Sequence, residues 1–146
     1  MHRRGWLTTL TLLLLLHGPA FADSKSHRLA LQISDDAPEK MNAVLNVAAN
    51  VSRYYSERGE EVAIEVIAFN AGLHMLRADT SPVQERIAGF RNNMTNVRFK
   101  ACQNTLEGME KRETRSITLL PGVEKVSSGV PRLLELAEAG WVIIRP

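Results

Sequence analysis

The chain has 146 residues, of which 45% are hydrophobic and 23% are charged, and this composition is typical of a globular chain of single-domain size. Its 18 basic and 16 acidic side chains leave a formal net charge of +2, which gives no electrostatic argument for binding nucleic acid or an anionic membrane surface. The single cysteine cannot form an internal disulfide or supply a structural zinc site, so no metal is expected.

The first 22 residues have the pattern of an export signal. A pair of arginines near the start precedes an apolar run over 6–16, which is too short to cross a bilayer comfortably. Ala20-Phe21-Ala22 then has the small-residue pattern of a cleavage site. We therefore expect a signal peptide over 1–22 and a mature domain over 23–146 in a periplasmic or secreted protein, without membrane association after cleavage. The two leader arginines account for the excess of basic side chains, so the mature domain is expected to be balanced in charge.

Strand-like and helix-like patterns alternate along the rest of the chain. The first half of the mature chain is predicted to contain a strand over Arg28–Ser34, a helix that follows Asp35 and Asp36 and runs to about Tyr55, a strand over Val62–Phe69, a short helix over Leu73–Arg77 and a helix from Ser81 to about Phe90. The second half is predicted to contain a strand over Asn96–Ala101, a helix beginning near Asn104, a short strand over Ile117–Leu120, a helix from about Ser127 to Gly140 and a strand over Trp141–Ile144.

The sequence also predicts where two helices begin and which faces of two elements are buried. Ser81 and Asn104 each begin a pattern typical of a helix capping box. Charged residues alternate with apolar ones in 96–101, which favours a strand with one wet face or a position near the sheet edge. The last helix is expected to bury a stripe made of Val130, Leu133, Leu134 and Ala137.

The alternation predicts an α/β domain with a mainly parallel sheet and helices on both faces. In such sheets, ligands and reactive groups gather beyond the carboxyl ends of the strands. Three turns are therefore expected to meet at one edge, namely 34–36, 69–72 and 101–104. Asp35 and Asp36 in the first turn are interpreted as a helix start rather than a catalytic carboxylate pair.

Cys102 lies in the third of these turns. It follows a strand-like run and precedes a helix-like stretch, so its thiolate would lie at the positive end of a helix dipole. Lys100, Gln103 and Asn104 give it polar neighbours, which favours a reactive thiol. The alternative is a small buried apolar residue, the commonest fate of a free cysteine. Both interpretations stay open on the residues alone.

The run Val97–Leu106, which contains Cys102, resembles the strand–cysteine–helix segment of the DsrE/DsrF-like (YchN-like) family of sulfur-relay proteins. Pro121-Gly122-Val123, the run Ser128–Leu133 and Gly140-Trp141 resemble that family as well. The resemblance implies a flavodoxin-like fold of about five strands and a homo-oligomer, often a trimer or hexamer. It further implies that the residue matching Cys102 carries sulfur as a persulfide and exchanges it with donor and acceptor proteins.

We therefore interpret the chain as an exported sulfur-handling protein, either a sulfurtransferase or a sulfur carrier. His74, Asn70, Gln103 and Asn104 are the candidate supporting residues around the thiol. No G-x-G-x-x-G and no Walker loop is present, so no nucleotide cofactor is expected.

Two other functions remain open. One is a non-catalytic oligomeric module that binds a small ligand or a partner in the sheet-edge crevice. The other is a hydrolase with Cys102 as nucleophile and His74 as base, which needs the two in hydrogen-bond reach. Tyr54, Tyr55 and Met75 are candidates either for a subunit contact or for the monomer core. The charged stretch 107–115 is either a partner-docking segment or, more simply, a solvated helix end.

Overall fold

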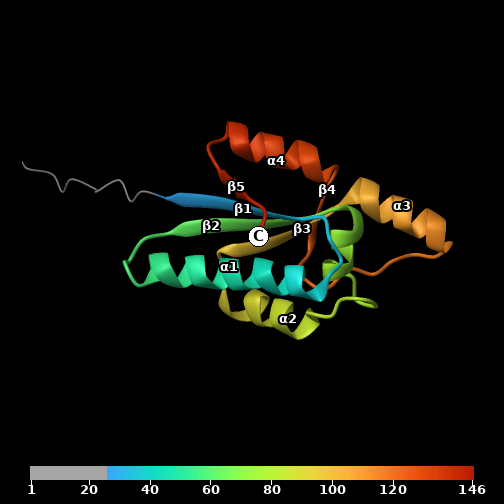
Figure 1. Ribbon diagram of the computed structural model, residues 1–146, viewed down its shortest axis with the longest axis horizontal. Helices are drawn as coiled ribbons and strands as arrows, with labels where there is room; N and C mark the ends of the chain where they lie inside the picture. The colour runs from blue at the N-terminus through green and yellow to red at the C-terminus, as the bar shows by residue number, and fades with distance from the viewer. Residues whose placement is uncertain (1–25) are drawn as a thin grey trace, which may run out of the picture.

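The computed structural model describes residues 26–146 (Figure 1), so the predicted signal peptide and its cleavage point lie outside the described residues. The elements are, in order, β1 (His27–Ile33), α1 (Pro38–Ser56), β2 (Val62–Ala68), the 3-10 helix η1 (Asn70–Leu76), α2 (Gln84–Asn93), β3 (Val97–Cys102), α3 (Gln103–Glu113), β4 (Glu124–Val126), α4 (Gly129–Glu138) and β5 (Val142–Ile144). In residues 26–146 no helix combines the length and apolar character that a membrane span requires.

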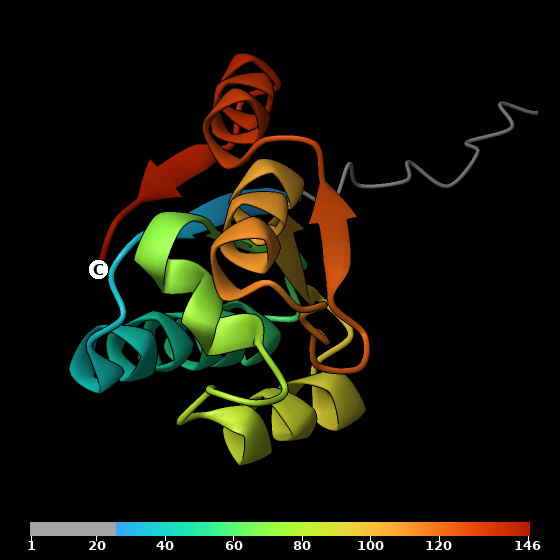
Figure 2. The same ribbon diagram turned by 90° about the vertical axis from the view of Figure 1, so that its right-hand side faces the viewer.

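The five strands form one sheet in the order β4-β3-β2-β1-β5, and every neighbouring pair is parallel. Helices α1 and α2 cover one face and α4 covers the other, as Figures 1 and 2 show from two directions. The predicted flavodoxin-like α/β fold is therefore confirmed. Helix α3 lies with η1 at the end of the sheet where the parallel strands terminate, the end that faces the viewer in Figure 2.

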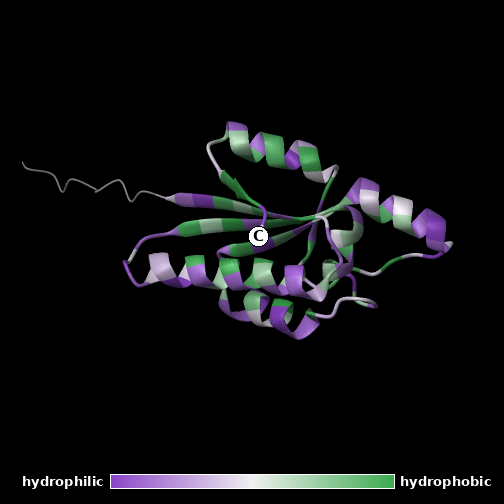
Figure 3. Ribbon diagram, viewed as in Figure 1, coloured by the Kyte–Doolittle hydropathy of each residue, from purple (hydrophilic) through white to green (hydrophobic). Residues whose placement is uncertain are grey.

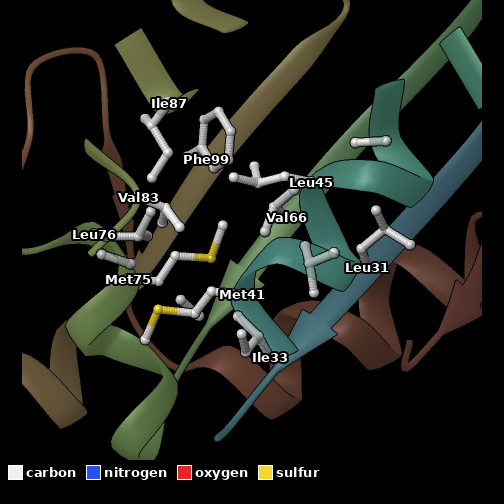
Figure 4. Close-up of a cluster of buried hydrophobic side chains, with 14 of the residues drawn as sticks. Leu31, Ile33, Met41, Leu45, Val66, Met75, Leu76, Val83, Ile87 and Phe99 are labelled. Atoms are coloured by element: carbon white, nitrogen blue, oxygen red, sulfur yellow. The ribbon is translucent and has the colours of Figure 1, made fainter. Parts of the chain in front are cut away.

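The two faces of the sheet are packed very unequally. Between the sheet and α1, η1 and α2 lies a large apolar cluster, part of which is drawn in Figure 4. The predicted stripe of α1 supplies Met41, Val44, Leu45 and Ala48 to it. Each fully buried side chain of this size contributes about 2 kcal/mol. Within residues 26–146, the buried apolar cluster under α4 consists of Ala30, Ile67, Leu133 and Leu136. Figure 3 shows the hydrophobic residues along the strands and along α4.

The predicted strand over Ile117–Leu120 is wrong. This segment forms only an isolated antiparallel bridge, between Leu119 and Arg77, and Leu120 donates its N–H to the carbonyl of Leu76 at 2.8 Å. Its apolar residues pack onto η1 rather than into the sheet, and periodicity cannot distinguish these two environments. The fourth strand lies just beyond Pro121-Gly122, at Glu124–Val126.

Both predicted capping boxes are wrong as well. Helix α2 begins at Gln84, because the hydroxyl of Ser81 donates to the carbonyl of Met75 (2.6 Å) and accepts the N–H of Val83 (3.3 Å), which closes a turn before the helix. Helix α3 begins at Gln103 with Cys102 as its N-cap residue, so Asn104 lies inside the first turn.

The predicted buried stripe of the last helix is correct at Leu133 only. Leu136 is the second buried leucine, whereas Val130 and Leu134 are 51% and 60% exposed and Ala137 also faces solvent. Helix α4 presents Leu133 and Leu136 to the sheet because Gly129 is buried against the ring of Phe69. The packed stripe therefore contains positions 129, 133 and 136.

For the third strand, the predicted position near the sheet edge is confirmed, because β3 lies next to the edge strand β4, whereas the predicted solvent-exposed face is only partly present. Arg98 is exposed, but Lys100 is buried, because β4 lies outside β3 and Glu124 of β4 accepts a hydrogen bond from Lys100 Nζ at 2.6 Å. Of the three candidates for a subunit contact, Met75 is fully buried and belongs to the monomer core. Tyr54 is exposed and Tyr55 is half-buried.

Candidate functional site

Three turns meet at the carboxyl edge of the sheet, as the sequence predicted. Gly72 of η1 lies so close to the end of β1 that a Cβ atom would stand 2.3 Å from the carbonyl oxygen of Ile33, so only glycine fits there. Asn70 donates its backbone N–H to the hydroxyl of Thr105 in the first turn of α3 at 3.1 Å. The turns after β1, β2 and β3 thus form one contiguous surface. In the first of them Asp35 accepts the N–H of Ala37 at 2.8 Å, which is turn chemistry.

Cys102 is the last residue of β3 and the N-cap residue of α3. Its thiol is free, and the residue is 4% exposed. It is less accessible than its predicted position at a polar edge suggested. Although buried, it belongs to neither of the two apolar clusters.

Polar groups at the N-termini of two helices influence the ionisation of the Cys102 thiol. Burial of the sulfur raises the pKa of this thiol, but the hydroxyl of Thr105 and the backbone N–H groups of Thr105, Gly129 and Asn104 lower it by more. The pKa of Cys102 therefore lies below the usual value of a thiol. Thr105 and Asn104 belong to the first turn of α3, and Gly129 is the first residue of α4. Both macrodipoles favour the thiolate in the same sense.

The backbone orients the Thr105 hydroxyl toward the sulfur. Oγ1 accepts the N–H of Asn70, so its own hydrogen remains available as a donor, and this hydroxyl lowers the pKa of Cys102. Asn70 has a positive φ of 49°, in the left-handed region where asparagine is tolerated better than most residues. Asn70 thus acts on the thiol through its backbone N–H and the Thr105 hydroxyl.

Replacing Thr105 with valine should raise the pKa of Cys102, because the isosteric methyl group cannot donate to the thiolate. A hydrogen bond to a charged group contributes about 1.5–3 kcal/mol, so alkylation near neutral pH should slow by about tenfold or more. Thr105→Ser keeps the hydroxyl and should retain most of the wild-type rate. Equal rates for the valine and serine variants across the pH range would show that the hydroxyl does not stabilise the thiolate.

The other predicted supporting residues lie near the thiol in sequence or at the same edge, but their side chains bond elsewhere. The ring of His74 is hydrogen-bonded to the hydroxyl of Thr80 at 2.9 Å, and no hydrogen bond joins it to Cys102 in residues 26–146. Gln103 donates to Glu107 at 2.7 Å. Asn104 is exposed, and its backbone N–H donates to the carbonyl of Ser127 at 3.3 Å. A hydrolase with His74 as base therefore lacks the contact it requires.

Two residues that contact the thiol were missed by the sequence analysis. Thr105 lies three residues after Cys102, the spacing of N-cap and N3 positions, and a Cys-x-x-Thr search at a helix start would have found it. Gly129 is distant in sequence and is placed by the packing of α4. A Cβ atom at Gly129 would lie 3.0 Å from the side chain of Phe69, so the close approach of this helix requires glycine.

Replacing Gly129 with alanine should push the start of α4 away from Phe69 and so withdraw the Gly129 N–H from the sulfur. We expect a higher pKa of Cys102 and a lower melting temperature. Gly89→Ala is the matched control, because Gly89 is also helical and a Cβ there meets no atom within 4 Å. The control should leave the thiol unchanged and stabilise the protein by about 0.5–1 kcal/mol. Equal thiol titrations for both variants would contradict the role of Gly129.

An ion cluster centred on the buried Arg77 fixes α3 to η1 at the same edge. Arg77 is 1% exposed and bonds both carboxylate oxygens of Asp79 (2.9 and 2.8 Å) and of Glu113 (2.6 and 2.9 Å). Arg115 also pairs with Glu113, at 2.8 Å, and with Asp79. These contacts lower the pKa of both carboxyl groups and raise that of Arg77. Glu113 and Arg115, at the end of the charged stretch 107–115, thus form ion pairs within this chain.

No group of three or more potential metal-binding side chains is placed to hold an ion within residues 26–146. The candidate site therefore consists of the Cys102 thiol, the donors around it and the ion cluster that positions α3.

Comparison with protein-family models gave no match, and comparison with curated proteins gave none either. Among solved structures, the chain is similar to MTH1491 from Methanobacterium thermoautotrophicum, a protein described as of unknown function. The two are 31% identical over 82% of this chain and 99% of MTH1491, with a TM-score of 0.70. The chain is also similar to YchN from E. coli, at 15% identity, over 83% of this chain and 99% of YchN, with a TM-score of 0.56. The second similarity concerns the fold alone. The chain therefore belongs to the same family as MTH1491 and has a DsrE/YchN-like fold.

Proposed function

We propose that this protein accepts sulfane sulfur on Cys102, holds it as a persulfide and passes it to an acceptor thiol. One arrangement supports this proposal: the single cysteine ends β3 and caps α3 at the carboxyl edge of the sheet, where polar groups of two helix N-termini lower the pKa of its thiol. A cysteine that served only to pack the interior would have no need of such polar groups, and burial alone would raise its pKa.

The chemistry needs no cofactor. The Cys102 thiolate attacks the outer sulfur of a persulfide or polysulfide, a new S–S bond forms, the old S–S bond breaks, and its electron pair leaves with the donor thiolate or hydrosulfide. In the second step an acceptor thiolate attacks the outer sulfur, and Cys102 departs as a thiolate. A low pKa favours both ionisation in the first step and departure in the second. The same N–H groups suit the anionic persulfide.

The export pattern in 1–22 supports a periplasmic or secreted location for this chemistry. A homo-oligomer is part of the proposal. Exposed apolar side chains on α4 (Val130 and Leu134) and on the edge strand β5 (Val142 and Ile144) support it. The sulfur donor and acceptor are proposed to be proteins or small sulfane compounds of the same compartment.

Anaerobic exposure of the reduced protein to polysulfide tests the proposal. We expect intact-mass spectrometry to show a gain of one sulfur atom per chain, and we expect a thiol reductant to remove it. A short peptide containing one cysteine is the control, because its modification shows that the polysulfide can react with an accessible thiol. Modification of the peptide without modification of the folded protein would reject sulfur acceptance by Cys102.

A second candidate function is a binding module in which Cys102 is only a packed residue. The limited accessibility of Cys102 favours it, as does a groove of about 470 Å³ between α1 and the β5 edge, lined by Tyr54, Tyr55, Val142 and Ile144 among others. Thiol reactivity separates the two functions. A pH midpoint of alkylation at or above that of a peptide thiol would favour the binding module, because the midpoint reports ionisation and not access.

A further inference from the structure

A buried carboxylate lies beneath α4 and is not used in the chemistry above. Glu65 of β2 is 7% exposed on the sparsely packed face of the sheet. Arg132 of α4 binds it through two nitrogens, with Nη2–Oε1 at 2.8 Å and Nε–Oε2 at 3.2 Å. The pair joins the helix directly to the centre of the sheet, because β2 is the middle strand. The planar two-point contact fixes orientation as well as distance.

The position of this pair relates it to the thiol. Glu65 is in register with Arg98 of β3, four residues before Cys102, which is roughly 13 Å along the strand. Arg132 lies three residues after Gly129, less than one helical turn away. The pair therefore fixes the first turn of α4. The chain that leads into this turn lies beside the thiol, because Val126 pairs with Cys102 and the carbonyl of Ser127 accepts the N–H of Asn104 at 3.3 Å.

Few other contacts hold α4 in place. Its buried apolar residues are Leu133 and Leu136, which meet Ala30 and Ile67 of the sheet. The partly buried residues packed against them are Phe69, Trp141 and Ile143. Figure 1 shows α4 as the helix that covers this face, opposite the paired layer of α1 and α2. With so small an apolar contact, a charge-assisted two-point bond at the first turn has a large share in setting where the helix starts.

We propose that Glu65 and Arg132 are positioning residues that hold the N-terminus of α4 over the Cys102 sulfur and so set both the ionisation of the thiol and its access to reagents. This inference rests on the sulfur chemistry proposed above, because a thiol that is both activated and covered suits a carrier that must keep its sulfur until an acceptor arrives. The pair acts on the sulfur through Gly129 and does not touch it.

The rate of alkylation by iodoacetamide, measured across a pH range, separates the two effects. The midpoint of the profile reports ionisation, and the plateau at high pH reports access, because the thiol is then fully ionised. We expect Arg132→Gln to shift the midpoint upward and to raise the plateau several-fold. Glu65→Gln should act in the same direction, and the double variant should add little to either single variant, because all three break the same contact.

Arg98→Gln is the matched control. Arg98 lies on the strand next to Glu65 and has the same charge as Arg132, but it is exposed and its contact with Glu124 is long, at 3.7 Å. Its profile should coincide with that of the wild type. Ile87→Val, which weakens the core on the opposite face, controls for loss of stability without displacement of α4 and should leave the midpoint unchanged.

If Arg132→Gln does not fold, Arg132→Lys decides the question, since it keeps the charge but loses the two-point contact. An intermediate shift of midpoint and plateau supports the positioning role. A profile identical to the wild type for the folded variant overturns it. Alkylation requires no sulfur donor, so a wild-type protein that takes up no sulfur while Arg132→Gln shows the expected shift would contradict the proposed function alone.

Discussion

Cys102→Ser should abolish the uptake of sulfur from polysulfide completely. The sequence contains one cysteine, so no second thiol can accept the sulfur and mask the loss. Serine keeps the shape of the side chain, but its hydroxyl is not ionised at neutral pH and forms no persulfide. Intact-mass spectrometry after anaerobic exposure to polysulfide should show the sulfur adduct in the wild type and none in the variant.

The folded state of this variant should survive, because Cys102 is the N-cap residue of α3 and serine is among the preferred residues at that position. Melting temperature and circular dichroism provide the control. A sulfur adduct that persists in well-folded Cys102→Ser protein would place the sulfur elsewhere and refute the assignment of this residue.

Arg77→Met should cost about 3 kcal/mol of unfolding free energy, the largest stability effect we expect from a single side chain outside the apolar core. Methionine fills most of the volume but leaves Asp79 and Glu113 without the guanidinium that bonds all four of their carboxylate oxygens. Both carboxylates are about one-third exposed, so water and Arg115 recover part of the loss. Denaturation in urea measures the difference. Arg91→Met is the control, because Arg91 is exposed with long hydrogen bonds, and should change stability by less than about 0.5 kcal/mol.

The pH dependence of the same two proteins provides a second readout. The pKa values of Asp79 and Glu113 are lowered in the folded state from reference values of 3.8 and 4.5. Their contribution to stability is therefore present above those values and is lost as the pH falls toward the folded-state pKa values. Arg77→Met should flatten the loss of stability between neutral pH and acid. Parallel stability curves for the two proteins would contradict the role of this cluster.

The first half of the fold could be predicted because it depends on local pattern. The stripe from Met41 to Ala48 specifies a helix against a sheet, and the apolar run of β2 specifies a strand covered on both faces. These elements place the end of β3 at the carboxyl edge, so the location of Cys102 followed from topology. The same topological reasoning predicted that the 69–72 turn lies at the same edge of the sheet as Cys102.

The remainder depended on contacts between residues far apart in the sequence. Ile117 and Leu120 are buried against η1, and nothing in their spacing distinguishes this from burial in a sheet. Helix α4 is turned by the contact of Gly129 with Phe69, which lies sixty residues earlier. For the same reason the donors at the thiol were only partly predictable, since Gly129 reaches Cys102 through the tertiary packing of a separate helix.

The pKa of the Cys102 thiol tests the account most directly. The thiolate absorbs in the ultraviolet, so a pH titration of the wild type, with Cys102→Ser subtracted as the blank, reports this one group. The structure predicts a midpoint below the reference value of 9.0 for the thiol. A midpoint at or above that value would mean that burial outweighs the hydrogen bonds, and Cys102 would then be a packed residue rather than the carrier of sulfur.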